Sequence, residues 1–328
     1  MVVLPFTIPP IKYVNYIAFE LGITLNMKGT LPWYYMNYTQ LCCKKEPLHS
    51  DNNKLKFSML HNPFLDKTSL PIDFVKDLDS TLHFIKVSLR HGYYIKTSIN
   101  EFFIKTRTSY RRKSFTHDIM IHGFDDSDET FHVSGYNNKR VFSMENVPYA
   151  NILDAFMFCH NPTRRLFELI RPVEKEVPFN KTFFTESILN YFNGSNTAQQ
   201  KHFSIQYQVD HVFGMDVYKY IIDFIYQNNQ ILDLRLFRSL LEHKIVMVER
   251  VKYVMENNYI PYSESLIEKF NVVLTKAQIL FNFILKLLVK ERPVGKEERQ
   301  HLVIQLNVIV DNESIALEKL LNSLNQGL

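Results

Sequence analysis

The spacing of apolar residues changes about halfway along the chain. Up to residue 160, helical and strand patterns alternate, whereas beyond it apolar residues recur almost only at helical spacing. The helices expected in the second half are residues 182–192, 214–228, 233–258, 263–291 and 295–325. This change predicts an α+β domain over residues 1–160 and an all-α domain over residues 161–328, built as a helical bundle.

The first half carries signals for both helices and strands. Its expected helices are residues 11–22, 73–91 and 148–159. Gly22 and Gly92 would end the first two, because glycine tolerates the backbone conformation that terminates a helix. Residues 93–104 have the alternation of a strand followed by a turn.

A β-hairpin is the clearest local prediction. Residues 118–124 and 130–136 are strand-like, and the polar segment DDSDE between them is typical of a turn. A third short strand is expected over residues 139–143. Together with residues 93–104, these segments predict an antiparallel sheet in the first domain.

Histidines in this hairpin are the first candidates for chemistry. Side chains alternate between the two faces of a strand, so His117 shares a face with Ile119 and Ile121, whereas His122 lies on the other. A histidine at a strand end can serve as a general base, or it can simply bond to backbone. His122 and His132 could be neighbours on paired strands, but two histidines are too few for a zinc site, and we expect no metal and no other cofactor. The chain has no phosphate-binding loop and no GxSxG elbow.

The charge pattern sets limits on partners. The formal net charge is +4, and the densest basic cluster is Arg107, Arg111, Arg112 and Lys113. This cluster is sparse for a nucleic-acid interface, so we expect no nucleic-acid binding. It is either a solvated loop or a docking surface for an acidic partner.

Three cysteines, Cys42, Cys43 and Cys159, form an odd and sparse set that is typical of a reducing compartment rather than of a disulfide framework. The first residues lack a basic segment followed by a long apolar run. We expect no apolar run to be long enough to cross a bilayer. These features predict a cytoplasmic protein with no membrane association.

The hairpin HDIMIHGFDD…TFHVSGY resembles the histidine strand of papain-like folds. More specifically, the chain resembles the family of butirosin-biosynthesis protein H, found beside nonribosomal-peptide and aminoglycoside assembly genes. The segments LNYFNGSN (189–196), FGMDVYKYI (213–221) and RSLLEHKIVMVERVKYV (238–254) are similar to the helical part of that family. The resemblance implies a papain-like, peptidase C39-like first domain that transfers an acyl group from a carrier-protein thioester to a small-molecule amine.

Two of the three catalytic positions that the resemblance implies are altered here. Its histidine corresponds to His117, which would be the general base. Its cysteine lies in a stretch like C-Y-V-N, where this chain has KYVN, so that Lys12 or Tyr13 occupies the nucleophile position. Its orienting aspartate lies in a stretch like V-A-D-F, where this chain has VSGY, so that Gly135 replaces it.

Two hypotheses follow from these departures. In the first, the protein is an amide-forming acyltransferase in which one of the three cysteines, or a desolvated Lys12, supplies the nucleophile. In the second, it is a pseudoenzyme that binds an acyl or peptidyl carrier protein or an active paralogous subunit, as a homo- or heterodimer. The second would be supported by apolar side chains exposed on the helical domain.

Overall fold

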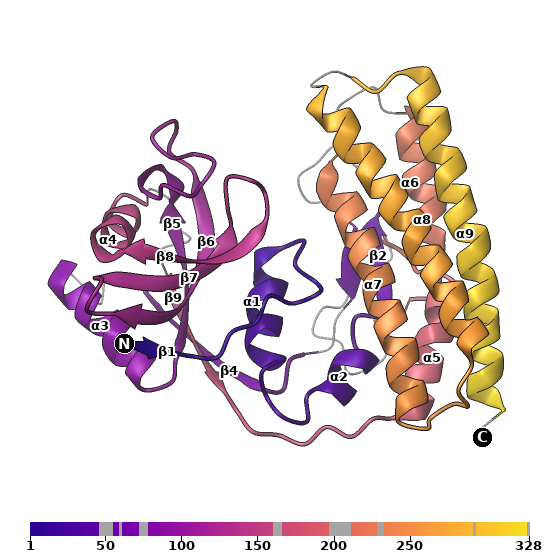
Figure 1. Ribbon diagram of the computed structural model, residues 1–328, viewed down its shortest axis with the longest axis horizontal. Helices are drawn as coiled ribbons and strands as arrows, with labels where there is room; N and C mark the ends of the chain where they lie inside the picture. The colour runs from indigo at the N-terminus through magenta and orange to yellow at the C-terminus, as the bar shows by residue number, and fades with distance from the viewer. Residues whose placement is uncertain are drawn as a thin grey trace. The chain divides into compact units, whose positions relative to one another are not determined.

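The protein is an α+β molecule that divides into two compact units (Figure 1). The computed structural model describes residues 1–45, 55–58, 61–71, 78–159, 166–196, 211–227, 233–290 and 293–326. Unit 1 comprises Met1–Thr30 and Asn62–Glu176, and unit 2 comprises Leu31–His61 and Val177–Leu328. Each unit is therefore assembled from two separate stretches of chain.

The boundary differs from the expected division at residue 160. Strand β9 (Leu166–Pro172) lies beyond it, yet β9 pairs with β4 (Leu65–Pro71) and β5 (Tyr94–Asn100) in unit 1. Conversely, β2 (Gln40–Lys44) pairs with β10 (His211–Phe213) in unit 2. Pairing between strands distant in sequence decides which unit a segment joins, and local apolar spacing does not reveal it.

Unit 1 is built on a seven-stranded sheet within the described residues. The strand order is β4-β9-β5-β6-β7-β8, with β1 (Val2–Val3) pairing with β6, and every pairing is antiparallel. The expected hairpin is confirmed as β6 (Thr116–Asp125) and β7 (Thr130–Tyr136). The third strand, β8 (Phe142–Pro148), begins three residues later than expected, because the side chain of Asn137 accepts hydrogen bonds from the amides of Lys139 and Val141 in a tight turn.

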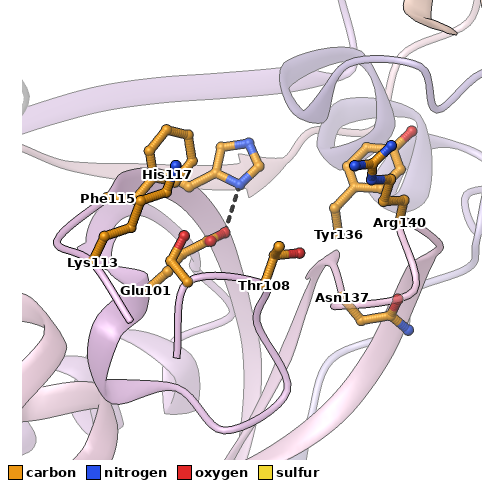
Figure 2. Close-up of a pocket in the computed structure, with 9 residues that line it drawn as sticks. Glu101, Thr108, Lys113, Phe115, His117, Tyr136, Asn137 and Arg140 are labelled. Atoms are coloured by element: carbon orange, nitrogen blue, oxygen red, sulfur yellow. Dashed lines mark hydrogen bonds and ion pairs between the residues drawn. The ribbon is translucent and has the colours of Figure 1, made fainter. Parts of the chain in front are cut away.

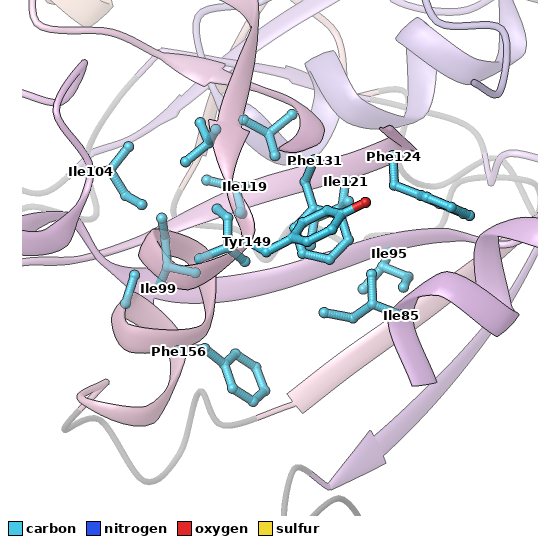
Figure 3. Close-up of a cluster of buried hydrophobic side chains, with 14 of the residues drawn as sticks. Ile85, Ile95, Ile99, Ile104, Ile119, Ile121, Phe124, Phe131, Tyr149 and Phe156 are labelled. Carbon is cyan, nitrogen blue, oxygen red and sulfur yellow. The ribbon is translucent and has the colours of Figure 1, made fainter. Parts of the chain in front are cut away.

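The two faces of this sheet are covered by different helices. Helices α3 (Leu78–Arg90) and α4 (Tyr149–Met157) pack on the face that carries Ile119 and Ile121, in the larger apolar core (Figure 3). Helix α1 (Asn15–Thr24) packs on the opposite face, which carries Met120. The side-chain alternation expected for β6 is therefore confirmed at these three positions. Residues 73–77 of the predicted second helix lie outside the described residues.

Helix α1 departs from its expected limits at both ends. It begins at Asn15 rather than at residue 11, because Val14 is still extended and prolines precede it at positions 9 and 10. It continues through Gly22 to Thr24, so the prediction that Gly22 ends the helix was wrong. A Cβ at Gly22 would lie 2.3 Å from the ring of Phe6, and the glycine instead allows this close packing.

Unit 2 combines a small sheet with long helices. The sheet has the order β10-β2-β3, where β3 is Lys56–Ser58. The described helices are α2 (Leu31–Met36), α5 (Lys181–Phe192), α6 (Asp216–Gln227), α7 (Leu234–Glu256), α8 (Glu264–Val289) and α9 (Lys296–Asn325). The five helices predicted for the second half match α5 to α9, except that residues 228 and 291 lie outside the described residues. Helix α8 packs against α7 and α9, and α9 also contacts α5 and α6.

Helix α8 differs from the expectation that no apolar run could cross a bilayer. By length and composition α8 is long and apolar enough to cross a membrane, since an 18-residue window within it has a mean hydropathy of 1.8. One third of that window is buried, and the buried side chains face the bundle. A core helix of a soluble protein has the same properties, so this helix is weak evidence for a membrane span.

Candidate functional site

His117 is held by a carboxylate that sequence reasoning did not identify. Its Nδ1 lies 2.9 Å from Oε1 of Glu101, a residue that is only 5% exposed. Glu101 begins the short 3-10 helix η2 (Glu101–Phe103) directly after β5, and Ile99 of β5 pairs with His117. The antiparallel register therefore brings a residue just past the end of β5 next to the imidazole at the start of β6. A buried carboxylate in this position fixes the orientation of the ring.

The other ring nitrogen of His117 faces Asn15, the first residue of α1. Nδ2 of Asn15 lies 3.3 Å from Nε2 of His117 and donates to the carbonyl of Asp118 at 2.9 Å. Because the Asp118 carbonyl can only accept, the amide nitrogen must point to this side. Nε2 is then an acceptor, and Nδ1–H donates to Glu101. In this tautomer, the Nε2 lone pair points toward the beginning of α1.

The residues expected at the nucleophile position lie elsewhere. The ammonium group of Lys12 donates to the carbonyls of Pro9 and Pro10, at 3.3 and 3.5 Å, and Tyr13 is 3% exposed. Among the described residues, the side chain that bonds to Nε2 is that of Asn15, three positions after Lys12. A carboxamide is not a nucleophile, so this contact supplies no reactive atom to His117.

The position expected for an orienting aspartate also has a different role. Gly135 on β7 lies under the buried guanidinium of Arg107, and a Cβ at Gly135 would come within 3.2 Å of it. Arg107 donates to the carbonyl of Tyr136 and pairs with Glu145 at 2.6 Å. Gly135 therefore makes room for a structural arginine, while Glu101 orients His117.

None of the three cysteines contacts His117 in the structure. Cys159 is buried, and its sulfur lies 3.7 Å from the hydroxyl of Thr116. Cys42 and Cys43 belong to β2 in unit 2, where their side chains are 0% and 2% exposed. Burial raises the pKa of the Cys43 thiol to about 12, which disfavours the thiolate.

A pocket of about 280 Å³ lies beside His117 in unit 1 (Figure 2). Two loops border it: one runs from η2 to β6 and the other joins β7 to β8. Its lining residues are Glu101, Thr108, Ser109, Lys113, Phe115, His117, Tyr136, Asn137 and Arg140. In Figure 2, Lys113 and Phe115 lie on the His117 side, whereas Tyr136 and Arg140 lie on the other. The pocket therefore combines aromatic surface, hydroxyl groups and two exposed cations around the imidazole.

The four residues of the basic cluster that the sequence indicated differ in their exposure to solvent. Arg107 is 3% exposed and forms part of the interior of unit 1, so it is not a surface charge. Arg111, Arg112 and Lys113 are exposed on the loop that borders the pocket. The structure thus places Lys113 in the lining of the pocket beside His117, and Arg111 and Arg112 on the same loop.

His122 and His132 are neighbours, as the hairpin pairing allows. Their ring centroids lie 6.3 Å apart, and His122 also stacks on Phe6 at 4.9 Å. In the part of the chain that the structure describes, no group of three or more histidine, cysteine, aspartate or glutamate side chains is arranged to hold a metal ion. Both ring nitrogens of His122 are buried without a hydrogen-bond partner, which is typical of a histidine that is neutral in the folded state.

Replacing His122 with phenylalanine is expected to reduce acid destabilisation. Burial, and then the nearby His132, lowers the pKa of His122 to about 4. Below about pH 6.5 the unfolded chain takes up a proton that folded His122 does not, so stability falls as the pH falls toward 4. We expect this residue to account for a loss of about 2 kcal/mol between pH 6.5 and 4.5. Urea unfolding at both pH values measures it.

His83 provides the matched variant, because its exposed ring on α3 meets water in the folded and the unfolded chain. His83→Phe should retain the acid sensitivity of the natural protein. Equal sensitivity of His122→Phe and the natural protein would contradict the assignment of a buried, neutral His122.

No known family model and no curated protein sequence matches this chain. The fold and the site therefore define the protein by themselves. It is an α+β protein in which unit 1 carries a Glu–His pair, with an asparagine amide on the second imidazole nitrogen.

Proposed function

We propose that this chain is a papain-like relative that has given up cysteine catalysis and acts as a binding subunit in natural-product assembly. Its partner would be an acyl or peptidyl carrier protein, or a paralogous subunit that supplies the chemistry. The observation that carries this proposal is the amide of Asn15 on Nε2 of His117. A papain-like acyltransferase needs a thiolate at this point.

The papain-like interpretation of unit 1 is supported by three features together. A helix N-terminus faces a histidine near the start of a strand, a carboxylate orients that histidine from the other side, and an antiparallel sheet carries them. In papain-like folds the reactive thiol lies at this helix N-terminus, where the helix dipole favours negative charge and lowers the pKa of the thiol. Under this proposal, the site resembles a papain-like site in geometry and lacks its reactive atom.

A binding role is supported by apolar side chains exposed on unit 2. Five of them, Val272, Ile279 and Val289 on α8 and Ile304 and Ile315 on α9, are between 42% and 82% exposed. Such side chains on two adjacent helices can take part in a contact with a partner protein. The enzyme hypothesis instead requires a nucleophile beside His117, and the described residues offer an amide there.

The proposal predicts that His117→Ala leaves biological function intact. In cells that depend on this protein for product formation, the variant should sustain normal product levels and should still retain the carrier protein or paralogue in a pull-down. Asp128→Ala, on the hairpin turn, is a matched control for substitution of an exposed residue in the same unit. Loss of product with folded His117→Ala, or absence of any partner in the pull-down, would contradict a binding role.

A further inference from the structure

Five exposed cations lie on the two loops that border the unit 1 pocket, and we call them the basic rim: Arg111, Arg112, Lys113, Lys139 and Arg140. Two of them, Lys113 and Arg140, line the pocket itself. All five are exposed, and none forms an ion pair with a carboxylate of the described residues. Two acidic residues of this region are already engaged, since Glu101 bonds to His117 and Glu145 pairs with Arg107. The mouth of the pocket therefore has an excess of positive charge that no carboxylate in the described part of the chain pairs with.

The basic rim is anchored rather than loosely attached. Its two loops are joined by a hydrogen bond from the amide of Asn138 to the carbonyl of Thr106, at 2.7 Å. Beneath them, buried Arg107 donates to the carbonyl of Tyr136 and forms an ion pair with Glu145. The cations are consequently presented from backbone that is fixed on the sheet, which lowers the entropic cost of binding a ligand.

Two of the rim cations occupy backbone positions that favour glycine. Arg111 has φ of +50° and Arg140 has φ of +59°, in the left-handed region that ordinary side chains adopt only at a cost. The Asn137 turn holds Arg140 there, with the amide of Arg140 donating to the carbonyl of Asn137 at 2.9 Å. Glycine would suit either position better on backbone grounds alone. Residues held in such conformations by the surrounding structure concentrate at functional sites.

The wall of the pocket complements the charge. The ammonium group of Lys113 lies 5.5 Å from the ring centre of Phe115, so an aromatic surface and a cation adjoin on one side. On the other side, Arg140 lies next to Tyr136, and Thr108 lies between the two sides with its hydroxyl available (Figure 2). An oxyanion placed between the two cations would leave the rest of its molecule against the aromatic rings and near His117.

We propose that this pocket binds a small molecule that carries a carboxylate or a phosphate, with the anionic group held by Lys113 and Arg140 and an apolar portion against Phe115 and Tyr136. This goes beyond the proposed function, because it requires no carrier protein or paralogue and would hold for the isolated chain. The volume of about 280 Å³ suits a ligand of roughly the size of a substituted benzene ring.

Titration calorimetry of the full chain with three probes tests this assignment. We expect saturable binding of phenyl phosphate or benzoate, weakened by added salt, and at least tenfold weaker binding of uncharged benzyl alcohol. Tighter binding of phenyl phosphate would identify a phosphate ligand, and tighter binding of benzoate a carboxylate. Absence of saturable binding of both anions, or equal binding of benzyl alcohol, would overturn the proposal.

Arg140→Gly separates binding from folding. It removes the cation and also the backbone strain, so the thermal midpoint should stay the same or rise while affinity for the better anion falls at least tenfold. Lys139→Gln removes the same charge one residue away, outside the pocket lining, and should change the affinity less than twofold. Glu129→Gly relieves a similar positive φ on the β6–β7 turn and should leave binding unchanged. Equal affinity of Arg140→Gly and the natural protein would overturn the proposal.

Discussion

Replacing Lys244 with methionine is expected to lower the free energy of unfolding by about 3–5 kcal/mol. Lys244 on α7 and Glu313 on α9 form an ion pair in which the side chains are 1% and 0% exposed. Removing the cation leaves a carboxylate buried in unit 2 without its counter-charge. The cost is large because water cannot reach the site to solvate the remaining charge.

The surrounding network explains why this pair is integral to the bundle. The hydroxyls of Tyr191 on α5 and Tyr218 on α6 donate to Glu313, at 3.1 and 2.6 Å. Lys244 also bonds to Nδ1 of His243, whose Nε2 lies 2.8 Å from the carbonyl of Thr39. Burial holds the pKa of His243 well below its usual range, so the neutral ring accepts from Lys244 and donates to Thr39. The network thus joins four helices to the segment that precedes β2.

Urea unfolding of matched variants measures this effect. Lys290→Met breaks the exposed pair with Glu298, in which Lys290 is 47% exposed, and should cost less than about 1 kcal/mol. The double variant Lys244→Met/Glu313→Leu should recover part of the loss, since no lone charge remains. If Lys244→Met alone does not fold, recovery in the double variant still identifies the buried charge as the cause. A cost below 1 kcal/mol for Lys244→Met would show that the pair does not carry the assigned role.

Asn15→Cys is expected to create a reactive thiol. The new sulfur would lie at the N-terminus of α1 and next to Nε2 of His117, two features that favour a thiolate. A thiol of ordinary pKa, about 8.5, is only a few per cent ionised at pH 7, so a lowered pKa should increase alkylation about tenfold or more. The variant should fold, because it removes an amide oxygen that is buried without a hydrogen-bond partner.

The rate of iodoacetamide labelling at pH 7 measures this gain, with the labelled residue identified by peptide mapping. Asn15→Cys/His117→Ala is the matched control, and without the imidazole its thiol should label at least tenfold more slowly than that of Asn15→Cys. The natural protein reports any background from Cys42, Cys43 and Cys159, all of which are buried. Equal rates in the single and double variants would show that His117 does not act on position 15.

The sequence predicted local elements better than it predicted the assembly of the units. The periodic apolar stripes located α5 to α9, because each helix buries one face in a bundle. The β6–β7 hairpin was evident from its alternation and polar turn. The sequence did not show that residues 31–61 belong to unit 2 and residues 161–176 to unit 1. That assignment depends on the pairing of β2 with β10 and of β9 with β4 and β5.

The candidate site was predicted only at His117. Glu101 could have been predicted in principle. Antiparallel pairing of residues 93–100 with the histidine strand places the next residue, Glu101, beside the imidazole. Recognising it required the register in which Ile99 faces His117. Asn15 was missed because motif spacing pointed to Lys12, whereas the helix starts three residues later, after the extended Val14.

The central claim is that the nucleophile position of unit 1 holds an amide and forms no covalent acyl intermediate. Intact-protein mass spectrometry after incubation with an acyl thioester, such as an acyl-N-acetylcysteamine, tests it most directly. The account predicts that the natural protein keeps its unmodified mass, while Asn15→Cys gains one acyl group that hydroxylamine removes. A hydroxylamine-sensitive acyl adduct on the natural protein that is lost in His117→Ala would contradict it.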